Sequence, residues 1–246
     1  MAKSPKIIGI IPARYSSSRF PGKVLAEIAG KPMIQHVYEQ CITASILDEL
    51  LVAVDDRRVY DCIVEFGGKA VMTKSDHQSG TDRLAEVMQG VDGEIVVNIQ
   101  GDQPLFDARM ITECVEPLLT DPEIPMSTIK TKIAEHEYHD PGIVKVVTDQ
   151  KGLALYFSRS LIPYSRDKQP IDVFEHVGLY AYRKEFLIKY AQMPPSALEK
   201  IEMLEQLRVL ENGCKIFVAE TKCRRESGFS VDTPEDLVEA ERMLAD

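Results

Sequence analysis

The chain has 246 residues, enough for one large α/β domain with an attached lobe. Its 29 basic and 39 acidic residues give a net charge of −10, so we expect neither nucleic acid nor an acidic membrane as a partner. Because no apolar stretch approaches membrane-spanning length and the first residues lack the apolar core of a signal peptide, we expect a cytoplasmic protein.

The first half of the chain alternates between apolar runs of strand length and segments with apolar residues at helical spacing. The apolar runs predict strands at residues 6–12, 50–54, 69–72 and 94–99. The helical spacing predicts helices at residues 32–44, from Val59 to Phe66, at 80–90, and from a cap at Asp107 to Leu118. Strands that alternate with helices imply a mostly parallel, Rossmann-like α/β sheet with helices on both faces.

The second half of the chain has a different pattern. It predicts strands at residues 126–133, 143–149, 153–158 and 174–183, with no long helix between them. We therefore expect a single domain, residues 1–246, in which an antiparallel extension at about residues 125–190 forms a smaller lobe.

Two helices are expected after this extension. The first opens with a capping box at Ser196 and Glu199 and ends at Gly213. Its inward residues should be Leu198, Ile201, Leu204 and Leu207. The last helix opens at residues 233–236, with the sequence TPED.

The loop that follows the first strand is strongly basic, although the chain is acidic overall. Arg14, Arg19 and Lys23, with three serines among them, offer the charged and neutral donors that suit a polyphosphate. The loop contains neither a Walker A motif nor a Rossmann GxGxxG motif. Because ligands collect beyond the carboxyl ends of parallel strands, this loop is a candidate phosphate site, the alternative being a solvated turn with ordinary surface charge.

Two carboxylates and one polar loop are further candidates. Asp102 follows an apolar strand in VVNIQGDQP, and Asp232 precedes a helix in VDTPED, where helix capping alone would explain it. Such carboxylates can hold one divalent cation between protein and phosphate, although the sequence does not show that they meet. The loop HQSGTDR, residues 77–83, has groups that can read a base edge, or it is an ordinary turn. His136 and His139 lack a third ligand and should be surface residues.

Taken together, these stretches resemble the 3-deoxy-manno-octulosonate (Kdo) cytidylyltransferases, which make CMP-Kdo for lipopolysaccharide. The resemblance runs over nearly the whole chain. Eight stretches occur in the family's order and spacing: PARYSSSRFPGKVL, GKPMIQHVYE, DHQSGTDRLAEV, VNIQGDQP, ALYFSRSLIPY, EHVGLYAYR, IEMLEQLRVLENG and VDTPEDL. Each stretch is weak evidence alone, but the series is specific.

The resemblance implies an enzyme that uses Mg²⁺ to transfer CMP from CTP to the anomeric hydroxyl of Kdo. The residues that would hold the triphosphate are Arg14, Arg19 and Lys23. The same three residues and Asp102 would act in catalysis. The residues that would line the rest of the nucleotide pocket are Ser79, Gly80, Arg83 and Gln100. Asp102 and Asp232 would hold the Mg²⁺. No protein general base is obvious, Asp102 being the one candidate.

The resemblance also implies a sugar site and a homodimer. Arg159 would clamp the sugar carboxylate. The residues that would contact the sugar hydroxyls are His176, Glu205 and Gln206. The antiparallel extension would serve sugar binding and dimer formation.

One position departs from the family pattern, because the usual GDEP has Gln103 in place of its glutamate. Either this side chain lies at the rim and the exchange is tolerated, or it faces the sugar or the metal and changes which sugar is accepted. We favour the rim, with Kdo as the substrate. The alternative is a cytidylyltransferase for a related acidic sugar such as 8-amino-Kdo. A glycosyltransferase is disfavoured because Asp102 does not begin a DxD pair.

Overall fold

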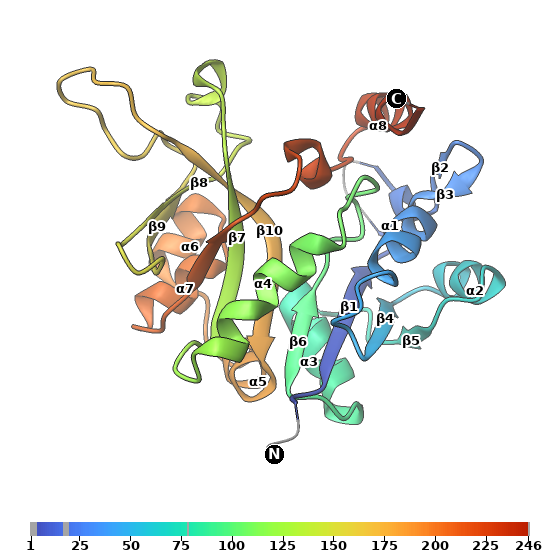
Figure 1. The fold of residues 1–246 in the computed structure, drawn as a ribbon. Coiled ribbons are helices and arrows are strands. Elements are labelled where there is room, and N and C mark those ends of the chain that lie inside the picture. Colours follow the sequence, from blue (N-terminus) through green and yellow to red (C-terminus); the bar gives the residue numbers. More distant parts are fainter. Residues whose placement is uncertain (1–3, 17–19, 78, 246) are drawn as a thin grey trace.

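The computed structural model describes residues 4–16, 20–77 and 79–245, and its centre is one large sheet (Figure 1). The strand order is β11-β7-β10-β6-β1-β4-β5, and β8 and β9 extend the sheet beside β10. The parallel part consists of β1 (Ile7–Ala13), β4 (Glu49–Val54), β5 (Ala70–Met72) and β6 (Ile95–Asn98). The predicted α/β class, with a mostly parallel sheet and an antiparallel extension, is confirmed.

Helices cover both faces of this sheet because its central strands are apolar on both sides. In β1, Ile7 and Ile11 enter one hydrophobic cluster, whereas Ile8 and Ile10 enter the other. The first cluster includes α1 (Met33–Cys41), α2 (Arg57–Glu65) and α4 (Arg109–Thr120). The second cluster includes α3 (Gly80–Gly90), α5 (Lys184–Ala191) and α7 (Gln206–Glu211). A small hairpin, β2 (Glu27–Ile28) and β3 (Lys31–Pro32), precedes α1.

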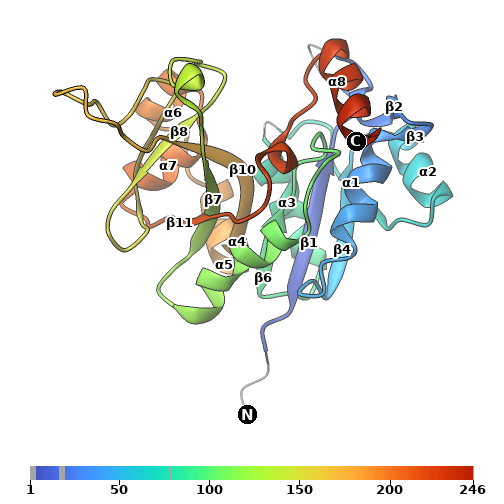
Figure 2. The same cartoon turned by 45° about the horizontal axis from the view of Figure 1, so that its top comes forward.

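The four strands of the second half form where the sequence predicts them. They are β7 (Met126–Lys132), β8 (Lys145–Thr148), β9 (Ala154–Ser158) and β10 (Phe174–Arg183). β10 is antiparallel to both β6 and β7, so it joins the parallel part to the extension. Figures 1 and 2 show β8, α6 and α7 on one side of β10, and α1, α2 and β4 on the other. The chain between β9 and β10 leaves the body as a long loop (Figure 1).

The predicted helix from Ser196 to Gly213 is wrong in one respect, because the chain forms two helices there. The capping box at Ser196 and Glu199 opens α6 (Ala197–Glu202), but Met203 then takes a left-handed conformation with φ 55°. The turn directs Ile201 outward, at 77% exposure, instead of into the core as expected. It also brings the Glu199 carboxylate to Arg208 of α7, whose Nε donates to it over 2.8 Å.

Several elements lie outside the sequence-based expectations, among them the hairpin of β2 and β3. α5 follows β10 directly, and β11 (Phe217–Glu220) adds a parallel edge strand to β7. A short 3₁₀ helix, η3 (Arg225–Gly228), leads to α8 (Pro234–Ala245). The division into one domain with a lobe at about residues 125–190 stays a prediction.

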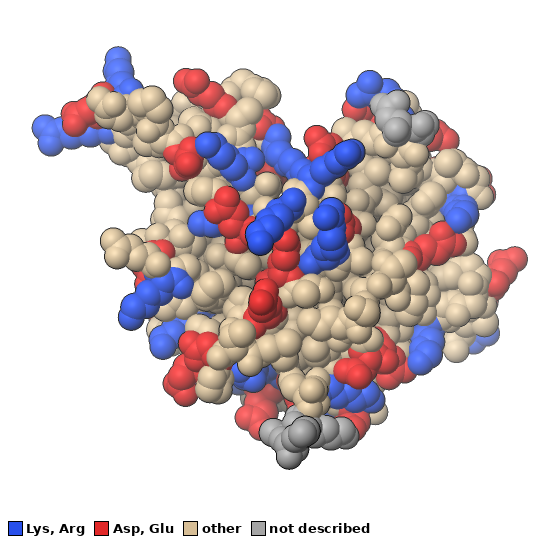
Figure 3. Space-filling view, viewed as in Figure 1, with Lys and Arg blue, Asp and Glu red and all other residues tan. Residues whose placement is uncertain are grey.

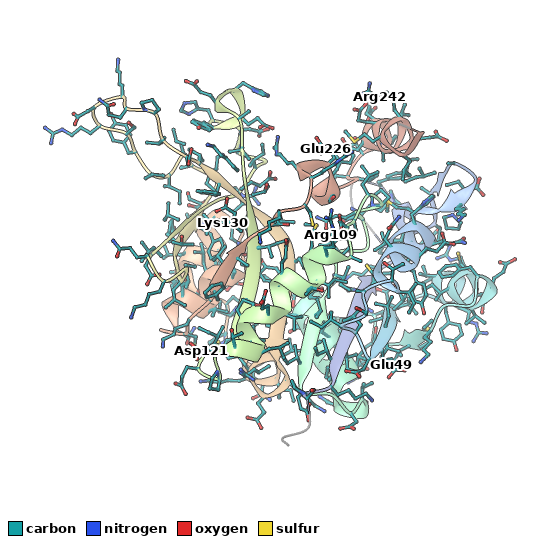
Figure 4. All side chains as sticks on the ribbon, viewed as in Figure 1. Glu49, Arg109, Asp121, Lys130, Glu226 and Arg242 are labelled. Carbon is teal, nitrogen blue, oxygen red and sulfur yellow. The ribbon has the colours of Figure 1, made fainter. Side chains whose placement is uncertain are left out.

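Basic side chains are unevenly distributed over the surface. Figure 3 shows Lys and Arg gathered in the middle of one face, although the chain has a net charge of −10. Figure 4 labels Arg109 of α4 and Lys130 of β7 on that face. Within the described residues, no helix combines the length and the apolar character needed to cross a membrane.

Candidate active site

Several of the predicted site residues lie where three neighbouring parallel strands end. β1 pairs with both β4 and β6 in parallel, so the segments that follow these strands leave the sheet at one edge. The three segments begin at Arg14, Asp55 and Ile99. Arg14 is half-buried at the start of its loop, whereas Ser17, Ser18 and Arg19 lie outside the described residues.

Asp102 and Asp232 are 130 positions apart in the chain but contact the same cation. The Lys23 Nζ lies 2.6 Å from Asp102 Oδ2 and 3.0 Å from Asp232 Oδ1, and it also donates to the Val231 carbonyl at 3.0 Å. Burial opposes the charge of the Lys23 ammonium, but the two carboxylates outweigh burial and raise its pKa. The point where these three oxygens converge therefore suits a cation.

The same oxygens are of the kind that Mg²⁺ takes in proteins, namely carboxylates and a backbone carbonyl. The donor set fits a hard divalent ion without further protein ligands, because Mg²⁺ commonly completes its coordination with water and substrate phosphate. Lys23 occupies this position here. The Lys23 ammonium that is predicted to contact the triphosphate is therefore the same group that contacts both carboxylates in this structure.

Arg83 does not face a pocket in this arrangement, because its side chain is completely buried. It donates to Asp55 Oδ2 over 2.9 Å and to the Thr73 hydroxyl. The other oxygen of Asp55 accepts the Tyr15 N–H at 3.2 Å. Arg83 thus reaches the basic loop through Asp55, and a direct contact with nucleotide would require it to move.

Tyr15 closes the basic loop at its neck. The Tyr15 carbonyl accepts the N–H of Gly22 at 2.9 Å, so the two ends of the loop are joined. The Arg58 guanidinium lies over the Tyr15 ring, 3.5 Å from its centre. Gly22 has φ +72°, and a Cβ there would lie 3.3 Å from the ring. Sequence reasoning missed Asp55 and Tyr15, although a carboxylate directly after a buried strand was the available signal.

A cavity of about 200 Å³ opens beside this loop. Its lining residues are Pro12, Gly80, Thr81, Asn98, Gln100, Tyr180, Tyr182, Tyr190 and Glu205. The structure therefore brings together Gly80, Gln100 and Glu205, which the sequence predicts for nucleotide and sugar. Ser79 lies next to the cavity as the N-cap of α3. Burial raises the pKa of the Glu205 carboxyl, which accepts the Thr81 hydroxyl at 3.0 Å.

A larger cleft of about 730 Å³ adjoins the first cavity, because Gln100 and Tyr180 line both. Asp102, Asp232 and His176 also line this cleft. The His176 ring contacts the Thr128 hydroxyl at 2.9 Å, and burial lowers its pKa to about 3.

The wall of this cleft carries an ion-pair cluster that the sequence did not suggest. Arg225 contacts Glu137 at 2.5 Å and Glu175 at 3.2 Å. Tyr180 was expected only to pack, and it does stack on Tyr182. It also lines both cavities, so it belongs to the candidate site.

Two other predicted residues, Arg159 and Gln206, line neither of these cavities. Arg159 donates from Nε to the Glu202 carbonyl at 2.9 Å and from one terminal nitrogen to the Pro141 carbonyl at 3.0 Å. Gln206 is buried at 3% exposure. Gln103 does line the larger cleft, but it too is only 3% exposed, so the expectation that it lies at the rim is wrong.

Comparisons with known proteins agree with one another. A family model described as Cytidylyltransferase matches residues 8–216. A 3-deoxy-manno-octulosonate cytidylyltransferase of Trichlorobacter lovleyi is 53% identical over 97% of this chain and 98% of that protein. A protein of the same name from Geobacter sulfurreducens is 51% identical over 94% and 96%.

Solved structures give the same result. A structure of CMP:2-keto-3-deoxy-manno-octonic acid synthetase complexed with CTP has a TM-score of 0.93 and 45% identity, and covers 98% of each chain. A 4-diphosphocytidyl-2C-methyl-D-erythritol synthase from Anaerococcus prevotii has a TM-score of 0.65 at 15% identity, covering 99% of this chain and 100% of that one. The second likeness concerns the fold alone.

Proposed function

Because this chain belongs to the 3-deoxy-manno-octulosonate cytidylyltransferase family, we propose that it transfers CMP from CTP to the anomeric hydroxyl of Kdo and releases pyrophosphate. The observation that carries the proposal within this chain is the convergence of Asp102, Asp232 and Lys23 at the edge of the sheet. A site of this charge pattern suits a polyphosphate bound together with a cation.

Positioning and electrostatics do most of the work in such a phosphoryl transfer. Arg14 and Lys23, with Arg19, would neutralise the charge that develops on the phosphates as pyrophosphate leaves. Asp102 and Asp232 would hold Mg²⁺, which when bound supplies charge neutralisation and favours ionisation of the attacking hydroxyl. The joined neck at Tyr15 and Gly22 keeps the basic loop next to these carboxylates.

The adjoining cavities give the two substrates neighbouring places. Gly80 and Gln100 would contact the nucleotide in the smaller cavity, and Glu205 and His176 would contact sugar hydroxyls. His176 has a lowered pKa, so it stays neutral at physiological pH and can offer one donor and one acceptor. Arg159 lines neither cavity in this arrangement, and it would reach the sugar carboxylate with the guanidinium hydrogens that the Glu202 and Pro141 carbonyls do not occupy.

The Mg²⁺ dependence, the homodimer and the cytoplasmic location belong to this proposal and are supported by the resemblance to the family. The dimer would form through the antiparallel extension. Lipopolysaccharide synthesis is the expected use of the product.

The test is a pyrophosphate-release assay with purified protein. CTP and Mg²⁺ are combined in turn with Kdo, 8-amino-Kdo and a sialic acid, and ATP and UTP replace CTP in parallel reactions. We expect the highest kcat/KM with CTP and Kdo and no turnover after chelation of the metal. A kcat/KM for 8-amino-Kdo at least about tenfold above that for Kdo, or ~1.4 kcal/mol of discrimination, would reassign the sugar.

A further inference from the structure

Gln103 is tied to the segment that carries Asp232. Its Nε2 donates to the Gly228 carbonyl at 3.2 Å and to the Ser230 hydroxyl at 3.3 Å. Only the nitrogen of the amide can donate to a carbonyl, so the Gly228 contact fixes the orientation of the side chain. Both bonds cross from the end of β6 to the residues just before Asp232.

A backbone bond beside Gln103 makes the same connection. The Val231 N–H donates to the Asp102 carbonyl at 2.9 Å, and Val231 is fully buried. Residues 229–232 belong to no helix or strand, so regular structure does not fix their course. The consecutive residues Asp102 and Gln103 therefore hold the Asp232 segment at three points.

We infer that Gln103 is a positioning residue, whose amide N–H groups hold the Asp232 segment so that Asp232 and Asp102 converge on one cation. This inference rests on the proposed function, because it takes these carboxylates as the metal ligands. It replaces both expectations for residue 103, since the side chain neither lies at the rim nor acts by touching the sugar. Its action is through Gly228 and Ser230.

A glutamate, usual for the family at this position, would not serve in this chain as it is arranged here. An ionised carboxylate has no N–H or O–H to donate, so it would face the Gly228 carbonyl with like partial charge. The Gln103 Oε1 is buried and has no hydrogen-bond partner among the described residues. Glutamate would place a charged oxygen there, where desolvation is most costly. Gln103 thus makes a hydrogen bond to the Gly228 carbonyl that an ionised glutamate of the same length could not make.

The experiment compares Gln103→Glu and Gln103→Met with the wild-type chain. Methionine keeps the approximate length and removes the donor without adding charge. The exposed Gln89→Glu on α3 is the matched control for the added charge, and Ser230→Ala removes only the longer of the two contacts. Metal binding is measured directly, from the electron paramagnetic resonance signal of free Mn²⁺, beside steady-state kinetics and the melting temperature.

We expect both Gln103 variants to bind Mn²⁺ about tenfold more weakly, the loss typical of a lost partner that orients a metal ligand. Their kcat should fall by a similar factor, while the KM for Kdo stays within about twofold. Ser230→Ala should lose less than about threefold in Mn²⁺ affinity, and Gln89→Glu should match the wild type. A variant that melts far below the wild type is set aside, and the comparison then rests on the other Gln103 variant and Ser230→Ala.

Several outcomes would overturn the inference. Unchanged Mn²⁺ affinity in the folded Gln103 variants would do so, and so would a wild-type chain that binds no Mn²⁺. A tenfold change in the preference between Kdo and 8-amino-Kdo, with metal affinity unchanged, would make residue 103 a specificity residue instead. Failure of the proposed function is separate, because it appears as a wild-type chain that binds Mn²⁺ but releases no pyrophosphate.

Discussion

Asp55→Asn tests whether the buried pair beneath the basic loop holds that loop in place. Asp55 uses one oxygen for Arg83 and the other for the Tyr15 N–H. Asparagine has a single acceptor oxygen, so Arg83 and Tyr15 would compete for it. The amide nitrogen would then face one of two donors, and the guanidinium of Arg83 would remain fully buried without a negative partner.

The expected cost follows from this burial. Removing one partner of a buried ion pair costs about 3–5 kcal/mol. The Asp55 side chain is 10% exposed, and the remaining oxygen still accepts one bond, so we take about 2–3 kcal/mol of unfolding free energy. In a chain of this size, that loss lowers the melting temperature by about 4–12 °C. The KM for CTP should rise as well, because the neck of the loop loses an anchor.

Urea unfolding of Asp55→Asn, Arg83→Met and the double variant measures the coupling between the two side chains. We expect a coupling of at least about 1 kcal/mol, since the residues are in direct contact. The neighbouring Asp56→Asn is the control. Asp56 caps α2, and asparagine caps a helix equally well, so its cost should stay below about 0.5 kcal/mol. A coupling between Asp55 and Arg83 below about 0.5 kcal/mol would refute the reasoning.

Three further predictions concern the site. Asp102→Asn should lower turnover by about a hundredfold or more, because a lost metal ligand removes several kcal/mol of transition-state stabilisation. Turnover within about threefold of wild type would exclude the metal role. Arg159→Lys should raise the KM for Kdo and leave the KM for CTP unchanged, because lysine cannot keep both carbonyl contacts and also bind a carboxylate as a fork. A rise in the KM for CTP alone would instead assign Arg159 to the nucleotide site. Stability should fall as the pH drops from about 6.5 toward 3, because unfolded histidine takes up a proton that His176 in the folded chain, with its pKa of about 3, does not. Urea unfolding at pH 7 and pH 5 should show a loss of up to about 2 kcal/mol that His176→Gln reduces, and an equal loss in that variant would contradict the assignment.

The fold could be predicted from the sequence wherever local pattern and tertiary environment agree. The apolar run at β1 and the helical spacing of apolar residues in α1 specify their elements without help from distant residues. The break at Met203 could not be predicted in this way. Its left-handed turn lets Glu199 meet Arg208 across the break, and that ion pair is visible only once both helices are placed. β11 was missed for a related reason, because its strand character depends on pairing with β7.

The same distinction between local pattern and distant partners applies to the candidate site. Residue type and position after a strand pointed to Asp102 and to the basic loop with Lys23, whereas Asp232 was selected only by the resemblance to the family, because helix capping alone would explain it. The sequence did not reveal which charges meet. The resemblance placed Arg83 in the nucleotide pocket, yet its guanidinium lies in the core against Asp55. A one-dimensional pattern gives the charge of a side chain but not the partner that neutralises it.

Lys23 shows how such a partner constrains function. The carboxylates of Asp102 and Asp232 carry two negative charges, and the single ammonium between them leaves the cluster at a net −1. A triphosphate brought to this cluster would be repelled unless further positive charge arrived with it. Lys23 can contact a phosphate only by giving up or sharing its bonds to the two aspartates, and each bond given up leaves a carboxylate that needs another cation. The proposed requirement for a divalent ion and the proposed release of Lys23 toward the phosphates would therefore be two consequences of one charge balance.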